Sequence, residues 1–487
     1  MDLLEQIHQL VIPFLIVSYA ISILLVIGVV VLENRNPLKS VSWIMILLLL
    51  PGLGIIFYLF FGQNLRKEKI IAHKGLKNLD QLFSLAQAQI TRLDEDNLLE
   101  GTPAHAKINL VRLLLNSSNS LITVGNRVTV LSSGTKKFEA LRKAITEAKH
   151  FIHLEYYIFD LDDIGTIIKN LLIDKARQGV EVRIIVDDVG SWELKSSFFK
   201  ELRAEGVEVE SFLKVRFPWL TSKVNYRNHR KIVVIDGEIG FIGGINIADR
   251  YLKGSEVYGI WRDTHLMIEG DAVNSLQTTF LIDWYFVSQT ELAEPKYFPT
   301  KKTLGDKIVQ ISASGPDSDW PAIMMGFFEA VSSANKYVYM ATPYFTPSES
   351  VLMAIKTAAM GGVDVRIIMP EKSDAFITLL SSRSFIKELL EAGVKVYFYQ
   401  KGFLHAKTMV VDNVLAAVGS ANMDFRSFEQ NFEITAFLYD EEIASVMQNA
   451  FLADLDDSRQ LTLEGWASRS VIEKAKESFA RLFSPLL

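Results

Sequence analysis

The sequence contains no cysteine among its 487 residues, and only eight histidines. Without cysteine the chain has no disulfide, no thiolate metal site and no cysteine nucleophile, although this leaves its compartment open. No charge of one sign dominates, because 51 basic and 57 acidic residues give a formal net charge of −6. Enzymes that act on nucleic acids more often carry a basic surplus, so we expect no nucleic-acid partner.

Charged residues are absent from two stretches near the N-terminus. Residues 10–32 form a run of 23 residues without a formal charge, and residues 40–65 form another of 26. At ~1.5 Å per residue a helix of that shorter run is ~34 Å long, enough to cross a ~30 Å hydrocarbon core. A short polar linker, residues 33–39, joins the runs. Residues 1–65 are therefore predicted to form a two-helix transmembrane hairpin; the alternative is a hairpin buried in a soluble protein.

The flanking charges predict how this hairpin is oriented. Asp2 and Glu5 make the N-terminus acidic, unlike the basic start of a cleavable signal peptide. Five basic residues follow the second run, whereas the linker carries two: the five are Arg66, Lys67, Lys69, Lys74 and Lys77. By the positive-inside bias we expect a multi-pass protein of the cell membrane with its large C-terminal part on the cytoplasmic side. Residues 66–105 are expected to be a helix-prone juxtamembrane connector.

The remainder of the chain repeats itself. Residues 179–186, GVEVRIIV, match residues 362–369, GVDVRIIM, and other strand-like and helix-like segments recur at similar offsets. Apolar β-branched runs that alternate with helical segments are typical of sheets covered on both faces. The repeat is too long for a solenoid unit. The sequence thus predicts an α/β fold with two duplicated domains, residues 106–305 and 306–487.

One short motif, H-x-K-x4-D-x6-G-[GS]-x-N, occurs once in each repeat, 176 positions apart. Its defining residues are His229, Lys231, Asp236, Gly244 and Asn246 in the first copy, and His405, Lys407, Asp412, Ser420 and Asn422 in the second. Two matches with the same spacing, drawn from so few histidines, are very improbable by chance. A single histidine near a strand is more often structural, but the repetition favours a functional role.

The motif brings together groups that suit a phosphodiester. Residues two apart on a strand project to the same side, so each copy presents an imidazole beside an ammonium, and the following turn adds an asparagine amide. If the two copies meet, these groups surround a space the size of an anion. The lysines and asparagines can hold phosphate oxygens, while one imidazole attacks phosphorus and the other protonates the leaving alkoxide. No metal or other cofactor is required, because the lysines supply the positive charge.

Further polar residues complete the predicted site. Asp263 and Glu433 lie 34 and 28 residues after the motif histidines, and a carboxylate bound to the second ring nitrogen would fix the tautomer; a surface charge is the alternative for either one. Asp236 and Asp412 are counted with the catalytic residues of the motif, although structural hydrogen bonds are the more natural role for them. Ser420, whose counterpart is a glycine, would add a hydroxyl to one side of the phosphate.

The paired motif resembles that of the phospholipase D superfamily, and within it the whole chain is similar to the bacterial cardiolipin synthases. The similarity includes residues 36–62 of the apolar N-terminus, the stretch NYRNHRK at residues 225–231 and the last residues, LFSPLL. It implies two phospholipase D-like α/β/α domains whose motifs meet at one active site. It further implies an enzyme that transfers a phosphatidyl group between two phosphatidylglycerol molecules, giving cardiolipin and glycerol, through a phosphatidyl-histidine intermediate.

The resemblance also implies a role for each site residue. His229 is expected to be the nucleophile and His405 the general acid and then base, although the symmetry of the motifs allows the reverse. Four residues would bind phosphate, namely Lys231, Lys407, Asn246 and Asn422. The carboxylates of Asp263 and Glu433 would orient the histidines.

Other functions remain open from the sequence. A hydrolase of the phospholipase D type, or a transferase acting on another alcohol, would share the covalent intermediate and differ only in the acceptor. A non-catalytic scaffold that binds anionic lipid would need none of the motif residues, which both repeats retain. The apolar segment at residues 217–220 is expected either to enter the membrane or line a lipid entrance, or to be a packed loop. The sequence does not indicate an oligomeric state.

Overall fold

The computed structural model describes residues 3–32, 37–50, 52–58, 77–95, 99–215, 225–299 and 303–486. Two compact units are distinguished: Met1–Ile70 with Val215–Asn225, and Ile71–Lys214 with Tyr226–Leu487. The apolar segment predicted at residues 217–220 lies outside the described residues.

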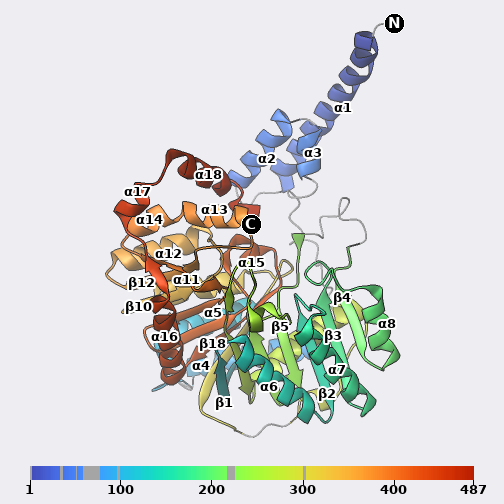
Figure 1. Cartoon of the computed structure of the whole chain (residues 1–487), viewed down its shortest axis with the longest axis vertical. Helices are drawn as coiled ribbons and strands as arrows, with labels where there is room; N and C mark the ends of the chain where they lie inside the picture. The colour runs from blue at the N-terminus through green and yellow to red at the C-terminus, as the bar shows by residue number, and fades with distance from the viewer. Residues whose placement is uncertain are drawn as a thin grey trace. The chain divides into compact units, whose positions relative to one another are not determined.

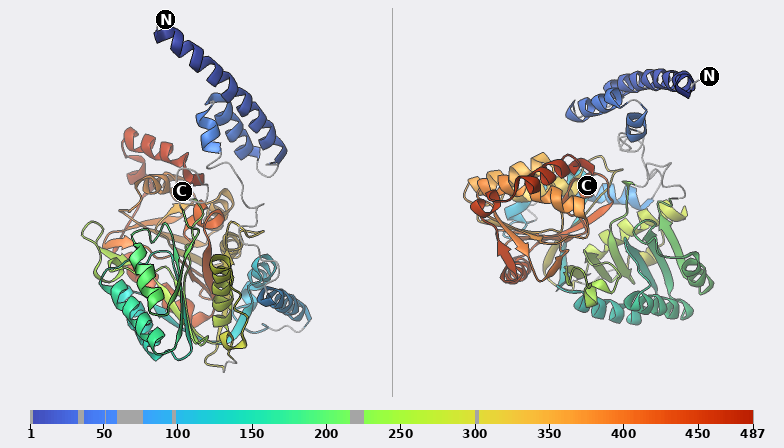
Figure 2. Two further views of the ribbon diagram at one scale, coloured as in Figure 1. Left: turned by 90° about the vertical axis from the view of Figure 1, so that its right-hand side faces the viewer. Right: turned by 45° about the horizontal axis from the view of Figure 1, so that its top comes forward.

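The N-terminal unit is built from three helices, α1 (Leu3–Leu32), α2 (Pro37–Leu49) and α3 (Leu53–Phe57). Helix α1 packs against α2, which in turn packs against α3 (Figures 1 and 2). Trp43 and Leu47 are buried between them, whereas other apolar side chains such as Phe14 and Leu24 are 64% and 69% exposed. Over the described residues alone, no helix meets both the length and the apolarity of a membrane span, so the predicted transmembrane hairpin is not shown by the structure.

The larger unit contains two halves with the same strand order. The first half runs β1 (Ile122–Leu131), β8 (His265–Glu269), β6 (Ile239–Gly243), β5 (Lys231–Ile235), β2 (Phe151–Tyr156), β3 (Glu181–Asp187), β4 (Glu208–Phe212). The second runs β9 (Lys307–Ser314), β18 (Glu433–Tyr439), β16 (Leu415–Gly419), β15 (Thr408–Val411), β10 (Tyr337–Ala341), β12 (Asp364–Pro370), β13 (Lys395–Tyr399). Antiparallel pairing of β1 with β9 joins them into a 15-stranded sheet, which β19 (Ser458–Gln460) completes at one edge. The predicted duplication is confirmed.

Helices cover both faces of this sheet, which explains why its central strands are buried along almost their whole length (Figure 2). The first half contributes α6 (Gly134–Glu147), α7 (Asp163–Arg177), α8 (Ser196–Ala204) and α10 (Ala272–Ser288). The second contributes α11 (Ala322–Ser332), α12 (Glu349–Met360), α13 (Phe376–Ser384), α14 (Ile386–Glu391) and α16 (Glu441–Asp456). Several begin at a side-chain cap, as where Asp162 accepts a hydrogen bond from the Gly165 amide and Asp440 accepts one from Ile443.

The first helices of this unit pack against its second half, although they precede the first half in sequence. Helix α4 (Lys77–Glu95) lies in the predicted connector and packs against α5 (Ile108–Ser118). Helix α5 in turn packs against α11 and β9, and its residues Leu110 and Leu114 are fully buried in the hydrophobic core of the second half. A domain boundary at residue 106 therefore does not follow the packing, because α5 precedes the first half in sequence but belongs to the core of the second.

Candidate functional site

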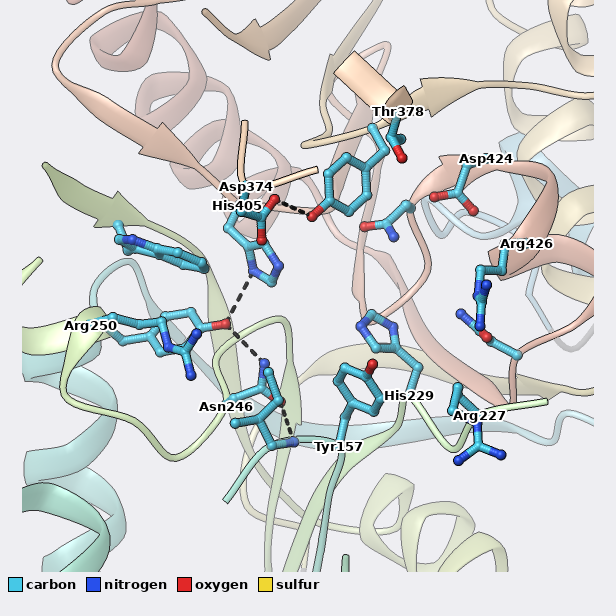
Figure 3. A pocket seen from close by; sticks show the side chains of 16 residues that line it. Tyr157, Arg227, His229, Asn246, Arg250, Asp374, Thr378, His405, Asp424 and Arg426 are labelled. Atoms are coloured by element: carbon cyan, nitrogen blue, oxygen red, sulfur yellow. Dashed lines mark hydrogen bonds between the residues drawn. The ribbon is translucent and has the colours of Figure 1, made fainter. Parts of the chain in front are cut away.

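The motif histidines of the two halves line one pocket, of about 350 Å³, where the halves meet. Figure 3 shows the rings of His229 and His405 both directed into it. The first half also contributes Tyr157, Ile158, Arg227, Asn246, Arg250, Tyr251 and Trp261, and the second contributes Tyr344, Asp374, Thr378, Asn422, Asp424, Arg426 and Asn431. Polar and cationic groups predominate in this lining, as a site for an anionic substrate requires.

The ring of His229 is held by a carboxylate from the other half. Its Nδ1 lies 2.9 Å from Oε1 and 3.0 Å from Oε2 of Glu433, the first residue of β18. Glu433 is fully buried and also accepts hydrogen bonds from Ser420 Oγ and from Asn431 Nδ2. Because Nδ1 is engaged with the carboxylate, Nε2 is the nitrogen left for the pocket.

His405 has the reciprocal arrangement. Its Nδ1 lies 2.7 Å from Oδ2 of Asp263, which is fully buried and belongs to the first half. The Lys407 ammonium and the Tyr251 hydroxyl also approach this nitrogen, at 3.0 and 3.4 Å. A ring nitrogen has one hydrogen-bonding position, so donation to Asp263 excludes acceptance from Lys407 at the same time. The shortest contact is the one with the carboxylate.

Backbone pairing between the halves produces this exchange of partners. The Asn228 segment forms a bridge with Phe432, and the His229 amide donates to the Phe432 carbonyl at 2.9 Å. On the other side, β14 (Gly402–Leu404) pairs in parallel with β7 (Ile260–Arg262), and the His405 amide donates to the Arg262 carbonyl at 2.7 Å. Each histidine therefore lies on a segment bonded to the residue that precedes the carboxylate of the opposite half.

The motif lysines lie behind the histidines. Lys231 and Lys407 are buried and are not in the pocket lining; each ammonium donates to the backbone carbonyl of the histidine two residues before it. Burial lowers the pKa of Lys231 to about 7 and that of Lys407 to about 8, while the carboxylates of Glu433 and Asp263 oppose the shift. Both lysines therefore bring titratable positive charge close to the reacting groups.

The two histidine–carboxylate pairs differ in their ionisation. Burial tends to raise the pKa of Glu433, but the charge and hydrogen bond of His229 outweigh it, so the pKa falls below its ordinary value. Burial raises the pKa of Asp263 to about 6, against the opposing charge of Lys407. Burial also lowers the pKa of His229 to about 4. At neutral pH the His229 ring is therefore neutral beside an ionised Glu433, the state in which Nε2 can act as a nucleophile.

The predicted phosphate-binding residues are not equivalent. Asn246 is engaged on both sides, because its Oδ1 accepts from the Ile158 amide at 3.2 Å and its Nδ2 donates to the Tyr251 hydroxyl at 2.9 Å. Asn422 also lines the pocket, and its buried Oδ1 has no hydrogen-bond partner among the described residues. The second asparagine thus has an unpaired acceptor, which suits a hydroxyl of the substrate and not a phosphate oxygen.

The structure corrects the expectation for Ser420. Its hydroxyl donates to Glu433 Oε2 and accepts from the Ile434 amide at 3.0 Å, so it supports the carboxylate and does not face phosphate. At the corresponding Gly244, an added Cβ would lie 2.3 Å from Asp263 Oδ1. The difference between the copies therefore follows from the position of the carboxylate, since only glycine leaves room for Asp263.

The motif aspartates lie away from the pocket. Asp236 accepts hydrogen bonds from the amides of the three residues 149–151, at 2.7 to 2.9 Å. Asp412 accepts from the amides of residues 335–337 and pairs with Lys107 at 3.2 Å. Each carboxylate thus fixes the start of the neighbouring strand, β2 or β10, and neither residue lines the pocket.

Comparison with known proteins agrees with this geometry. Residues 141–284 and 327–455 match the family described as "Cardiolipin synthase, PLD-like domain", and residues 20–63 match "Phospholipase_D-nuclease N-terminal". The cardiolipin synthase of Halalkalibacterium halodurans is 43% identical over 464 residues, which cover 95% of this chain and 92% of that protein. The chain belongs to the cardiolipin synthase family.

Other relatives extend the comparison. The cardiolipin synthase of Listeria monocytogenes is 41% identical over 97% of this chain and 100% of its own length. Among solved structures, the phosphatidylserine synthase of Haemophilus influenzae superimposes with a TM-score of 0.59 at 14% identity, covering 78% of this chain and 100% of the other. At that identity the likeness concerns the fold alone.

The repeated motif extends four residues beyond its asparagine, which the sequence analysis did not predict. Arg250 and Arg426 both line the pocket, and each lies four residues after the motif asparagine of its own half. The repeated pattern of this family member is therefore H-x-K-x4-D-x6-G-[GS]-x-N-x3-R. Arg227 and Asp374, which also line the pocket, have no such repeated spacing, and only the three-dimensional structure places them there.

Proposed function

We propose that the chain is a cardiolipin synthase that moves a phosphatidyl group from one phosphatidylglycerol to the free hydroxyl of another, releasing glycerol. The observation that carries the proposal is the pair of crossed histidine–carboxylate contacts, His229–Glu433 and His405–Asp263, which face one pocket. Two imidazoles at one phosphate provide both a nucleophile and a proton donor, as a double displacement requires. The relatives at 41–43% identity over almost the whole chain support the same activity.

In the first step, Nε2 of His229 attacks phosphorus and forms a phosphorus–nitrogen bond. The bond from phosphorus to the glycerol oxygen breaks, and His405 gives a proton to that oxygen so that glycerol leaves. The ionised Glu433 stabilises the cationic ring that develops on His229. The anionic phosphate in the pocket favours the protonated form of His405, which burial and the neighbouring Lys407 otherwise disfavour.

In the second step the same groups act in reverse. His405, now neutral, takes the proton from a hydroxyl of the second phosphatidylglycerol, whose oxygen attacks phosphorus. The phosphorus–nitrogen bond to His229 breaks, and cardiolipin is released. We assign the nucleophile to His229 because its partner Glu433 is ionised and is held by Ser420 as well, whereas burial raises the pKa of Asp263, the partner of His405, to about 6.

The charge on the phosphate is balanced by the protein. Lys231 and Lys407 supply positive charge from behind the histidines, and Arg250 and Arg426 supply it within the pocket lining. These groups supply electrostatic stabilisation of the kind that a divalent cation gives in other phosphoryl-transfer sites. The unpaired Oδ1 of Asn422 can accept a hydrogen bond from a substrate hydroxyl.

We further propose that the N-terminal unit is the membrane anchor and that the catalytic halves are cytoplasmic. Helix α1 is 30 residues long, and its sequence includes the uncharged residues 10–32. Its exposed apolar side chains, such as Phe14 and Leu24, suit a hydrocarbon environment better than water. The basic residues that follow residue 65 support the cytoplasmic orientation. Protease treatment of right-side-out and inverted membrane vesicles tests it: the catalytic halves should be digested only in the inverted ones.

Conversion of pure phosphatidylglycerol tests the function. Substrate labelled in the headgroup glycerol and in the acyl chains should yield free labelled glycerol and labelled cardiolipin in equal amounts. Accumulation of phosphatidic acid would instead identify a hydrolase, and transfer to added serine in preference to phosphatidylglycerol would identify another transferase. His229→Ala is the matched control, because a non-catalytic scaffold would behave identically with and without the histidine.

A further inference from the structure

Helix α18 (Val471–Arg481) presents its apolar face outward and a polar face to the protein. Val471, Ile472 and Phe479 are 80%, 69% and 64% exposed, whereas Glu477 and Ala480 are buried. Ile472 and Phe479 lie two turns apart on the same side of the helix, with the exposed Ala475 between them. A helix on the surface of a soluble domain normally has the opposite arrangement, with the apolar stripe in the core.

The outward stripe belongs to a well-anchored helix. Ser470 and Glu473 form a capping box at its start, and the buried Glu477 is paired with Arg469. At its other end Arg481 donates to Glu388 of α14 at 2.6 Å. The helix is thus fixed with its apolar side away from the core.

The apolar surface continues to the edge of the catalytic pocket. Helix α13 packs against α18, and its first residues, Phe376 and Ile377, are 67% and 53% exposed. The next residue, Thr378, lines the pocket, as does Asp374 shortly before them. Figure 1 shows α13 and α18 lying together at one end of the second half.

The first half has an exposed aromatic residue at the corresponding place. Strands β3 and β12 occupy equivalent positions in the two halves, and the segment after β3 carries Trp192, which is 79% exposed. The adjacent Ser191 donates from Oγ to the carbonyl of Tyr157 at 2.9 Å, and Tyr157 lines the pocket. Exposed apolar groups therefore adjoin both the first and the second half of the pocket lining.

Basic residues border the apolar stripe. Lys474 and Lys476 are exposed on α18, while of its two acidic residues Glu473 caps the helix and the buried Glu477 is paired with Arg469. An apolar stripe flanked by cations fits the boundary between the headgroups and acyl chains of an anionic bilayer. Such a border would be poorly suited to a partner with a cationic surface.

We propose that α18 and the start of α13 form an interfacial docking surface that holds the pocket against an anionic lipid bilayer. The proposal rests on the proposed function in one respect, namely that the substrate is a bilayer lipid. The docked surface would let phosphatidylglycerol headgroups reach His229 and His405 while the acyl chains remain in the membrane. This contact is separate from the anchoring proposed for the N-terminal helices, because it is made by the catalytic unit itself.

Site-directed spin labelling of the full chain tests the docking directly. The absence of cysteine allows single labels at Ile472→Cys and Phe479→Cys, with Val446→Cys on the exposed side of α16 as the control. In phosphatidylglycerol vesicles, labels 472 and 479 should lose accessibility to a water-soluble nickel complex and gain accessibility to oxygen, whereas label 446 should keep its nickel accessibility. Equal nickel accessibility at all three positions would overturn the proposal. The proposal would also fail if, in detergent without lipid, labels 472 and 479 were shielded from both reagents and the shielding increased with protein concentration. That result would mean that a second copy of the chain covers the stripe.

Activity provides an independent comparison. Ile472→Glu with Phe479→Glu should lower turnover of vesicle phosphatidylglycerol by about tenfold and leave turnover of monomeric short-chain phosphatidylglycerol unchanged. Val446→Glu should affect neither. Unchanged turnover of vesicle substrate in the double variant would contradict the proposal. If the wild-type protein makes no cardiolipin from either substrate, the proposed function fails, and the spin labels still report whether the surface docks.

Discussion

Glu433 holds the ring of His229, a residue 204 positions earlier in the chain, with both carboxylate oxygens within 3.0 Å of Nδ1. Asp263 holds His405 in the reciprocal sense, so each half of the sheet supplies a histidine to one pair and a carboxylate to the other. Neither half contains a complete pair by itself. The duplication therefore produces one active site and not two, and its assembly requires that both halves are folded and paired.

The crossed carboxylates should matter through their charge. We expect Glu433→Gln to lower kcat by about 10³-fold, because the amide keeps the shape but no longer stabilises a cationic His229 ring. Ser420→Gly, which removes one hydrogen bond to the same carboxylate, should cost less than about tenfold. Steady-state assays with phosphatidylglycerol measure both effects. Equal losses in the two variants would mean that the charge of Glu433 has no special part in the reaction.

Activity should show a bell-shaped dependence on pH. As the pH rises through about 6, Asp263 loses its proton and can orient His405, so the rate increases. As the pH rises further, Lys231 loses its charge near pH 7 and Lys407 near pH 8, so the rate declines. Lys231→Arg, which stays protonated, should move the start of the alkaline limb from near pH 7 toward pH 8, where Lys407 titrates. A kcat/KM profile that declines toward acid and is flat above neutrality would contradict this assignment.

The buried lysines should reduce stability in a pH-dependent way. The pKa of Lys231 is about 7 in the folded protein against an ordinary 10.5, so between these values the unfolded chain binds more protons and stability rises with pH. Lys231→Met removes this cost, and we expect it to raise the free energy of unfolding by about 1–4 kcal/mol at pH 6. The gain should shrink toward pH 9. Thermal unfolding at the two pH values measures it, and a gain that grows with pH would have the wrong sign.

Chelation should leave the activity intact. Positive charge at the phosphate comes from Lys231, Lys407, Arg250 and Arg426, so the proposed steps include no metal ion. The enzyme should retain its rate after dialysis against a strong chelator, assayed in chelator-treated buffer. Loss of activity that Mg²⁺ restores would reveal a metal-assisted step.

Local sequence patterns were enough to predict the duplicated α/β fold and the residues of the motif, because strand and helix periodicity and the repeat are properties of the chain itself. The crossing of the pairs could not be predicted. It depends on backbone pairing between segments such as Leu404 and Arg262, which lie 142 positions apart and carry no shared pattern. The role of Ser420 could not be predicted for a related reason. Its hydroxyl bonds to Glu433 because the fold places that carboxylate beside it, and the sequence does not show which way the hydroxyl points.

The packing of α5 illustrates a second limit. Its apolar face predicts burial, but periodicity does not say which core receives it, and the structure places Leu110 and Leu114 in the second half. The pocket arginines lie between these cases. Their equal spacing after Asn246 and Asn422 is visible in the sequence, but only the structure shows that both arginines line the pocket.

The central claim is that both halves act on one phosphate through a covalent intermediate on His229. The most direct test is rapid quenching of the His405→Ala protein with acyl-labelled phosphatidyl-p-nitrophenol, whose leaving group departs without the proton that His405 gives to glycerol, followed by proteolysis and mass spectrometry. Without His405 to activate the second hydroxyl, the account predicts that the labelled phosphatidyl group accumulates on the peptide containing His229, and that His229→Ala carries no label. Label found elsewhere in the His405→Ala protein, or label retained after His229→Ala, would contradict it.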